Sequence, residues 1–131
     1  MSSEEVTEIV AAIDAAMRER GLFRDAELNL AKLSRRLGLP ARQVSNAINR
    51  RYGMSVSQYV NGYRVRTACG LLVVSDEPVS TVMFEAGFMT KSNFNREFLR
   101  VAGTSPSAWR KSHRREAQNP GGERADERAR S

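Results

Sequence analysis

The stretch that decides the fold is VSTVMFEAGFMTKSNFNREFLRVAGTSPSAW, residues 79–109. In its first part, apolar residues at positions 79, 82, 83 and 86 recur with helical spacing, and Gly87 then ends that helix. In its second part, Phe94 and Phe98 lie on one stripe of another short helix, which Thr90 can cap at its N-terminus. Two short helices around a glycine turn predict a helix-turn-helix unit.

A second copy of this unit lies upstream, over about residues 29–53. Leucines precede a turn at Gly38, and Val44 and Ile48 follow the turn on one helical stripe. Positions 44, 48 and 53 have the same spacing as positions 94, 98 and 103, and only the turn differs in length, by one residue. Two matching copies in one short chain are a stronger indication of this unit than either copy alone.

The remaining segments complete an all-α fold of about seven helices. We expect a first helix over about residues 4–20, which Ser3 can cap and Gly21 can end. A linker helix over about residues 55–75 joins the first unit to the second, which covers about residues 78–103. A final helix over about residues 106–115 carries Trp109 as a core anchor. Residues 1–115 are thus predicted to form one domain, and residues 116–131 a disordered tail, because they contain almost no apolar side chains.

Charge is distributed unevenly along the chain. Residues 1–29 carry a net charge of −4, residues 30–109 a net charge of +7 and residues 110–131 a net charge of +3. Between residues 28 and 75 there are eight basic residues and no acidic one. An ordinary solvated surface mixes the two signs, so this stretch favours a polyanion such as DNA as the partner. The acidic first helix is expected to pack away from the DNA.

Several classes of function are excluded by residue counts. Cys69 is the only cysteine and His113 the only histidine, so the chain offers no disulfide, no metal-ligand cluster and no nucleophile–base pair. We therefore expect no enzyme activity, no cofactor and no metal site. No apolar run has transmembrane length, and Glu4 and Glu5 stand where a signal peptide would be basic. A cytoplasmic location is the resulting expectation.

One set of residues in and around the second unit follows a family pattern. These residues are Ala86, Gly87, Phe88, Ser92, Phe94, Arg96, Phe98, Gly103, Ser105, Pro106, Trp109 and Arg110. In this order they resemble the AraC-type family of bacterial transcription regulators, and the match extends over about residues 6–115. The resemblance implies two helix-turn-helix subdomains tied by a central helix, with both recognition helices in successive major grooves on one DNA face. The upstream unit departs from the family pattern at Pro40, where a serine cap is usual.

Placed on this pattern, the exposed side chains of both recognition helices are candidates for contact with DNA. Arginine and lysine can bond to guanine, and asparagine and glutamine to adenine, through the major groove. The candidates for base contact are Arg42, Gln43, Ser45 and Asn46 in the first recognition helix, and Lys91, Ser92, Asn95 and Arg96 in the second. The candidates for phosphate contact are Asn49, Arg50, Arg51 and Arg100. Asn95 also fits an ordinary surface residue, whereas Val44, Ile48, Phe94 and Phe98 are predicted core.

The function predicted from these features is sequence-specific binding of double-stranded DNA by a transcription regulator. The alternative is a non-sequence-specific nucleic-acid-binding or architectural protein, which would use the same basic stretch. Its weakness is that both recognition helices carry Asn, Gln or Arg side chains suited to reading bases. RNA polymerase is a further candidate partner, as is a sensing or dimerisation domain if the chain is a fragment of a longer protein.

Overall fold

The computed structural model describes residues 1–118, with side chains described as far as Arg114. The elements are α1 (Ser3–Arg20), a 3-10 helix η1 (Leu22–Arg24), α2 (Leu30–Leu37), α3 (Ala41–Tyr52), α4 (Val56–Val74), α5 (Val79–Glu85), α6 (Lys91–Ala102) and α7 (Pro106–Gln118). This described part contains seven α-helices and no strand, which confirms the all-α prediction.

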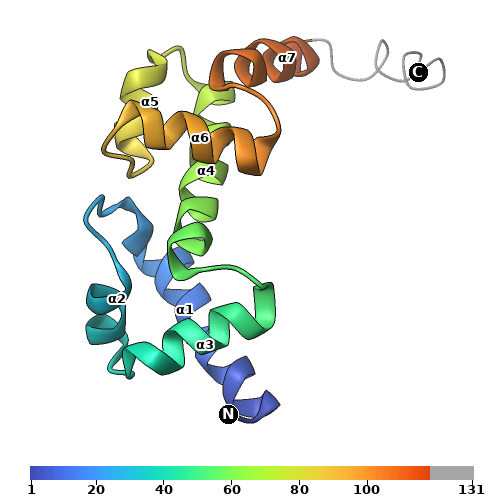
Figure 1. The fold of residues 1–131 in the computed structure, drawn as a ribbon. Helices are drawn as coiled ribbons and strands as arrows, with labels where there is room; N and C mark the ends of the chain where they lie inside the picture. The colour runs from blue at the N-terminus through green and yellow to red at the C-terminus, as the bar shows by residue number, and fades with distance from the viewer. Residues whose placement is uncertain (119–131) are drawn as a thin grey trace, which may run out of the picture.

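The helices form two groups along α4 (Figure 1). Helices α1, α2 and α3 gather around its N-terminal half, and α5, α6 and α7 gather around its C-terminal half. Each group contains one helix-turn-helix unit, α2–α3 in the first and α5–α6 in the second. We call the first group the N-terminal subdomain and the second group the C-terminal subdomain.

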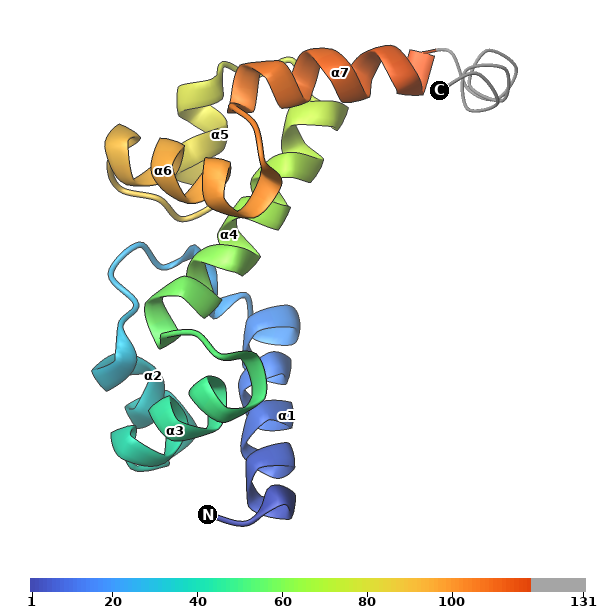
Figure 2. The ribbon, with the colours of Figure 1, turned by 45° about the vertical axis from the view of Figure 1, so that its right-hand side comes forward.

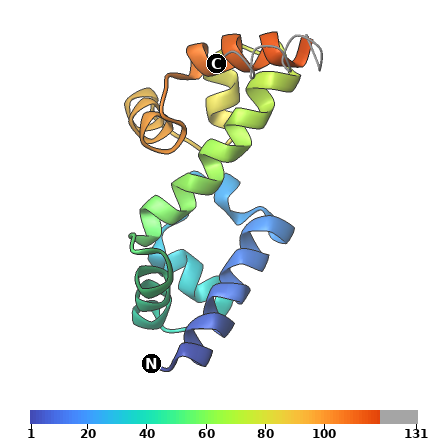
Figure 3. The same cartoon turned by 90° about the vertical axis from the view of Figure 1, so that its right-hand side faces the viewer.

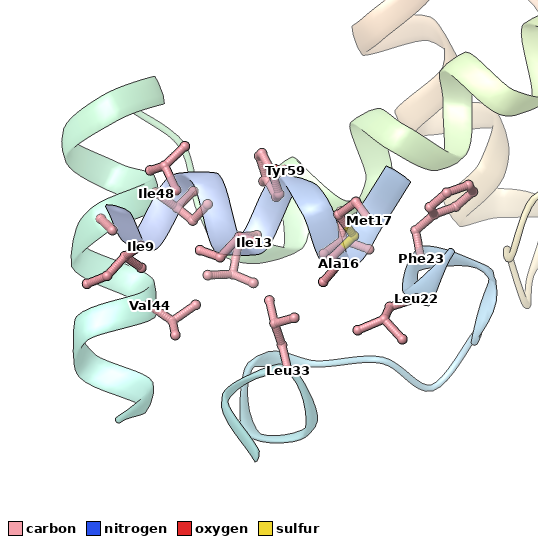
Figure 4. Packing of buried hydrophobic residues seen from close by; sticks show 14 of the residues in the cluster. Ile9, Ile13, Ala16, Met17, Leu22, Phe23, Leu33, Val44, Ile48 and Tyr59 are labelled. Atoms are coloured by element: carbon pink, nitrogen blue, oxygen red, sulfur yellow. The ribbon is translucent and has the colours of Figure 1, made fainter. Parts of the chain in front are cut away.

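The core of the N-terminal subdomain lies between α1 and the first helix-turn-helix unit (Figure 4). Ile13 of α1 lies on the side of Leu33 of α2 and of Val44 and Ile48 of α3, whereas Met17 lies nearer to Phe23, and Ile13, Met17, Leu33, Val44 and Ile48 are all fully buried. The prediction that Val44 and Ile48 belong to the core is therefore confirmed. Burial of such side chains is the main stabilising contribution to a subdomain of this size.

The core of the C-terminal subdomain is a row of aromatic rings. Phe94 meets Phe88 with ring centroids 5.1 Å apart and meets Phe98 at 5.6 Å, both edge to face. The half-buried Trp109 of α7 continues the row at 6.3 Å from Phe98. Phe94 and Phe98 are buried as predicted, and Trp109 packs against the same cluster.

Helix α4 belongs to both cores. Its first half gives Val56, Tyr59 and Val60 to the N-terminal core, and its second half gives Val65, Ala68 and Leu72 to the C-terminal core. The two sets lie on different sides of the helix, so each set packs against different neighbours. This explains why a helix with Gly62 and Gly70 in its interior is held in place, although glycine lowers helix stability by about 1 kcal/mol relative to alanine.

The ends of the helices agree with the expected caps in part. Asn29 and Thr90 accept hydrogen bonds from backbone N–H groups of α2 and α6, as predicted. Helix α1 is capped by Ser2, one residue before the predicted Ser3, because a capping box with Glu5 forms there. Helix α7 runs to Gln118, so residues 116–118 of the predicted tail are helical. The rest of that tail, residues 119–131, lies outside the described residues.

Candidate nucleic-acid interface

The two recognition helices, α3 and α6, lie on the same side of α4. Figure 3 shows both nearly end-on at the left of α4, with α1 on the opposite side. In Figure 1 both helices run from left to right, with α6 above α3, and in Figure 2 α6 again lies above α3. The acidic α1 is therefore placed away from the face that carries α3 and α6, as expected from its charge.

Helix α6 divides into a buried and an exposed face. Phe94 and Phe98 point into the aromatic core, whereas the four predicted base-contact residues Lys91, Ser92, Asn95 and Arg96 are all exposed. Arg96 is held from within the helix, because its Nη2 donates a hydrogen bond of 2.8 Å to Oδ1 of Asn93. The outward face thus presents a lysine, a serine, an asparagine and an arginine on one surface of the helix.

Helix α3 presents a similar face, although two of its predicted residues are less accessible. Arg42 and Asn46 are exposed, and Asn49 follows them one turn later. Gln43 and Ser45 are half-buried, and Ser45 lines a pocket between α3 and the start of α4. Arg42 and Asn46 are therefore the most accessible of the four predicted base-contact residues of α3.

The predicted phosphate-contact residues fall into two situations. Arg51 is exposed at the end of α3, and the exposed Arg50 donates a hydrogen bond from Nη1 to the carbonyl oxygen of Met1. Arg100 is also exposed, but it bonds to two helices: its Nη2 lies 2.8 Å from Oε1 of Glu97 and 3.2 Å from the carbonyl oxygen of Gln58. The structure thus places Arg100 between α6 and α4.

The basic stretch between residues 28 and 75 is mostly, but not wholly, a surface feature. Six of its eight basic residues are exposed: Arg35, Arg36, Arg42, Arg50, Arg51 and Arg66. Lys32 is half-buried, with Nζ 3.5 Å from Glu27 and 3.7 Å from Asp25. Arg64 is buried, so its charge is not available to a polyanion.

Sequence reasoning missed a buried polar cluster made by Asn61 and Arg64 of α4 and Glu97 of α6. All three are less than a tenth exposed. One signal for it exists in the sequence. Glu97 occupies the position between Phe94 and Phe98 where the apolar stripe of α6 continues, so a carboxylate there must be buried and must have partners.

The cluster is electrostatically balanced. Burial raises the pKa of the Glu97 carboxyl, but the hydrogen bond and charge of Arg100 and the hydrogen bond from Asn61 outweigh burial, so the pKa lies below its usual value. Burial also lowers the pKa of the Arg64 guanidinium, and the charge of Asp25 opposes this effect. Glu97 is therefore ionised, and Arg64 stays protonated because an arginine titrates far above neutral pH.

The remaining reactive side chains have structural surroundings. Cys69 is half-buried against the C-terminal core, and burial raises the pKa of its thiol to about 11. His113 stacks on Trp109 with ring centroids 3.5 Å apart. Among the described residues no group of His, Cys, Asp and Glu side chains is arranged to hold a metal ion. No helix in this part of the chain is both long and apolar enough to cross a membrane.

Two helix-turn-helix units on one shared helix, with both recognition helices exposed on one side, define a double helix-turn-helix DNA-binding domain. A family model described as a helix-turn-helix domain matches residues 33–112, from α2 to α7. The chain belongs to the AraC-type family of transcription regulators.

Known relatives agree with this assignment. The transcriptional activator NphR of Rhodococcus is 31% identical over 91 residues, 70% of this chain, and the activator RhaS of Pectobacterium carotovorum is 27% identical over 64% of this chain. The chain spans only 27% and 30% of the length of these two relatives. Among solved structures, the DNA-binding domain of the global transcriptional factor AdpA, in complex with a target DNA, has a TM-score of 0.68 and 26% identity. This similarity covers 89% of this chain and 97% of that one.

Proposed function

We propose that this domain binds double-stranded DNA as a monomer, at a bipartite site, and that it directs a transcription regulator to its target sequence. The observation that carries the proposal is the placement of α3 and α6 on the same side of α4, each with an exposed polar face (Figure 3). Successive major grooves on one face of DNA are about one helical turn, roughly 34 Å, apart. One chain with two recognition helices can fill both grooves without a second copy.

Arg42 and Arg96 are the proposed readers of guanine, one in each half-site. A guanidinium donates two parallel hydrogen bonds to O6 and N7 of guanine, and this pairing discriminates against the wrong base by about 1–3 kcal/mol. Asn46 and Asn95 lie on the same exposed faces and have the amide group that fits adenine. Lys91, Ser92, Gln43 and Ser45 complete the proposed base-contacting set.

Asn49, Arg50 and Arg51 are proposed to hold the DNA backbone next to the first half-site. All three are exposed in the second half of α3. Contacts to phosphate give affinity and register without reading sequence, and each contact releases condensed counterions. Arg100 is proposed as a phosphate contact next to the second half-site, because it is exposed and only its Nε and Nη2 bond to Glu97 and Gln58.

Relatives support the transcriptional part of the proposal. NphR and RhaS are named transcriptional activators, and the AdpA domain was solved with a target DNA. These activators are much longer than this chain. If this domain is part of a similarly long protein, we propose that the whole protein also contacts RNA polymerase and contains a separate sensing or dimerisation domain.

The experiment begins with selection of bound sequences from a random duplex library, which defines two half-sites. Each half-site is then scrambled in turn, and the Kd of the wild-type domain, Arg42→Ala and Arg96→Ala is measured for each duplex. Each variant should lose roughly 5- to 150-fold in affinity for the intact site. It should also become insensitive to scrambling at the bases that its own arginine reads, while it still discriminates in the other half-site.

Arg51→Ala is the matched control, because it removes an exposed guanidinium from the far end of α3. It should weaken intact and scrambled duplexes alike, and it should lower the slope of log K against log salt by about one unit. Selection that yields no common sequence, with equal affinity for all duplexes, would instead support the non-sequence-specific alternative.

A further inference from the structure

The two subdomains meet at a buried polar junction beside α4. We define the junction by the guanidinium of Arg64, the side chains of Asn61 and Glu97, the backbone of Phe23 and the turn at Gly87. These residues come from η1, α4, the second helix-turn-helix turn and α6. The junction therefore connects the segment that follows α1 directly to the unit that carries the second recognition helix.

Arg64 is the centre of the junction. Its Nε donates to the carbonyl oxygen of Phe23 at 2.7 Å, its Nη2 donates to the carbonyl oxygen of Asp25 at 2.8 Å, and its Nη1 donates to Oδ1 of Asn61 at 2.8 Å. The guanidinium also lies over the ring of Phe88, 5.9 Å from its centroid. A buried arginine is expensive unless its donors are satisfied. Here each of the three nitrogens of Arg64 donates one hydrogen bond, to acceptors in the N-terminal subdomain and in α4, and the guanidinium lies against a ring of the C-terminal core.

A second set of contacts ties α6 to α4. Asn61 Nδ2 donates to Oε1 of Glu97 at 3.3 Å, and the same oxygen accepts from Arg100 at 2.8 Å. Arg100 in turn donates to the carbonyl oxygen of Gln58, near the start of α4. The recognition helix of the C-terminal subdomain is thus hydrogen-bonded to the half of α4 that packs in the N-terminal subdomain.

Gly87 shows how closely the subdomains approach. Its φ of +104° places it in the region that favours glycine. A Cβ atom at this position would lie 2.5 Å from the carbonyl oxygen of Phe23, 3.1 Å from Cα of Arg24 and 3.1 Å from Nε of Arg64. The turn that orients α6 therefore rests on backbone atoms of the N-terminal subdomain.

We propose that this junction, and not α4 alone, fixes the separation and relative rotation of the two recognition helices, with Arg64 as the positioning residue. The proposal rests on the proposed bipartite DNA binding. A single helix such as α4 keeps its length but can bend, and a small bend of α4 would move the C-terminal subdomain relative to the N-terminal subdomain. Contacts that lie to one side of the helix, as the Arg64 and Glu97 contacts do, oppose that bend. The expected consequence is strict recognition of the distance between the half-sites.

A polar junction suits this task because hydrogen bonds are directional. An apolar contact tolerates sliding, whereas the planar fork of Arg64 meets its three acceptors in one geometry. A small rotation of the C-terminal subdomain against α4 would break the hydrogen bond between Asn61 and Glu97 and leave buried polar groups unpaired, which is unfavourable.

The test compares Arg64→Met with Arg66→Met. Both remove a guanidinium from α4, but Arg66 is exposed, lies over the ring of Tyr63 at 4.9 Å and, among the described residues, forms no hydrogen bond with the residues that define the junction. The binding sites are the selected duplex and two derivatives with one base pair added or removed between the half-sites. The wild-type domain and Arg66→Met should lose at least about tenfold in affinity on both derivatives. Arg64→Met should lose about threefold or less, while it still discriminates against scrambled half-sites.

Glu97→Gln is a milder variant that keeps the shape of the side chain, and it serves if Arg64→Met does not fold. It should reduce the spacing penalty in the same direction. A folded Arg64→Met or Glu97→Gln domain that keeps the full penalty, or a wild-type domain that reads both half-sites without regard to spacing, would overturn the proposal. Equal affinity of the wild-type domain for the selected duplex and for scrambled duplexes would refute the proposed function instead.

A measurement without DNA tests the role of the junction independently of the proposed DNA binding. Spin labels at Asn49→Cys on α3 and Asn95→Cys on α6, in a Cys69→Ser background, report the distance between the recognition helices. The wild-type junction should give one narrow distance distribution, and Arg64→Met should give a distribution at least twice as wide. Equal widths in the two proteins would overturn the role of Arg64 whatever the domain binds.

Discussion

Substitution of Gly87 by alanine should destabilise the domain far more than the equivalent change in the first unit. Gly38 has a φ of +69°, and a Cβ there would find open space, so Gly38→Ala should cost only the left-handed strain of about 1–2 kcal/mol. At Gly87 the φ of +104° lies further from the region that alanine tolerates, so the strain is at least as large, and it is joined by an approach of 2.5 Å to a backbone oxygen of Phe23. Relief of that overlap has to displace one subdomain from the other, and overpacking of this kind costs about 1–3 kcal/mol more.

Gly87→Ala should therefore lower the free energy of unfolding by about 2–5 kcal/mol, against about 1–2 kcal/mol for Gly38→Ala. Urea denaturation followed by far-UV circular dichroism measures both values under the same conditions. The larger loss is a substantial part of the roughly 5–15 kcal/mol typical of a small domain. Equal losses for the two variants would refute the reasoning, because they would show that the turn at Gly87 does not press on the N-terminal subdomain.

Three further predictions concern the core, the buried carboxylate and the thiol. Phe98→Ala should cost about 3–5 kcal/mol by thermal or urea unfolding, whereas Leu99→Ala, at a side chain 58% exposed, should change the stability by less than about 0.5 kcal/mol. The folded state lowers the pKa of the Glu97 carboxyl below its usual value of 4.5, so ionised Glu97 stabilises the fold above that pH, and this stabilisation is lost as the pH falls through the lower pKa of the folded state. Urea unfolding measured across that pH range should show this loss in the wild type and a flatter profile in Glu97→Gln. Cys69, with its pKa raised from 9.0 to about 11, should react with iodoacetamide at neutral pH roughly 100-fold more slowly than an exposed thiol and should regain the ordinary rate in denaturant.

The repeated units could be predicted from the sequence because their signals are local. Apolar spacing around Phe94 and Phe98, and caps such as Thr90, depend only on residues within a turn or two. The same holds for Val44 and Ile48, which were assigned to the core from spacing and are buried. The exposed faces of α3 and α6 follow directly, since the polar side chains lie opposite the apolar stripe.

The junction could not be predicted in the same way. The sequence groups Arg64 with seven other basic residues that could attract a polyanion, because composition does not distinguish a buried guanidinium from a solvated one. Its partners are backbone carbonyls of Phe23 and Asp25, about 40 positions away in the sequence, and backbone acceptors leave no pattern in residue types. The half-buried position of Ser45 has a similar origin, since the pocket that it lines also involves residues of α4.

The sharing of α4 by both cores limits how such a domain can vary in evolution. Each residue of an α-helix turns the chain by about 100° and advances it by about 1.5 Å. Insertion of one residue between Val60 and Val65 would thus swing the whole C-terminal subdomain, with α6, about a quarter-turn or more away from the face that α3 occupies.

Insertion of about seven residues would restore the facing, but it would move the second recognition helix about 10 Å further along the axis. No short series of single-residue changes leads from one arrangement to the other. New DNA targets can therefore arise readily by exchange of the exposed side chains of α3 and α6, whereas a change in linker length would have to come in a single jump.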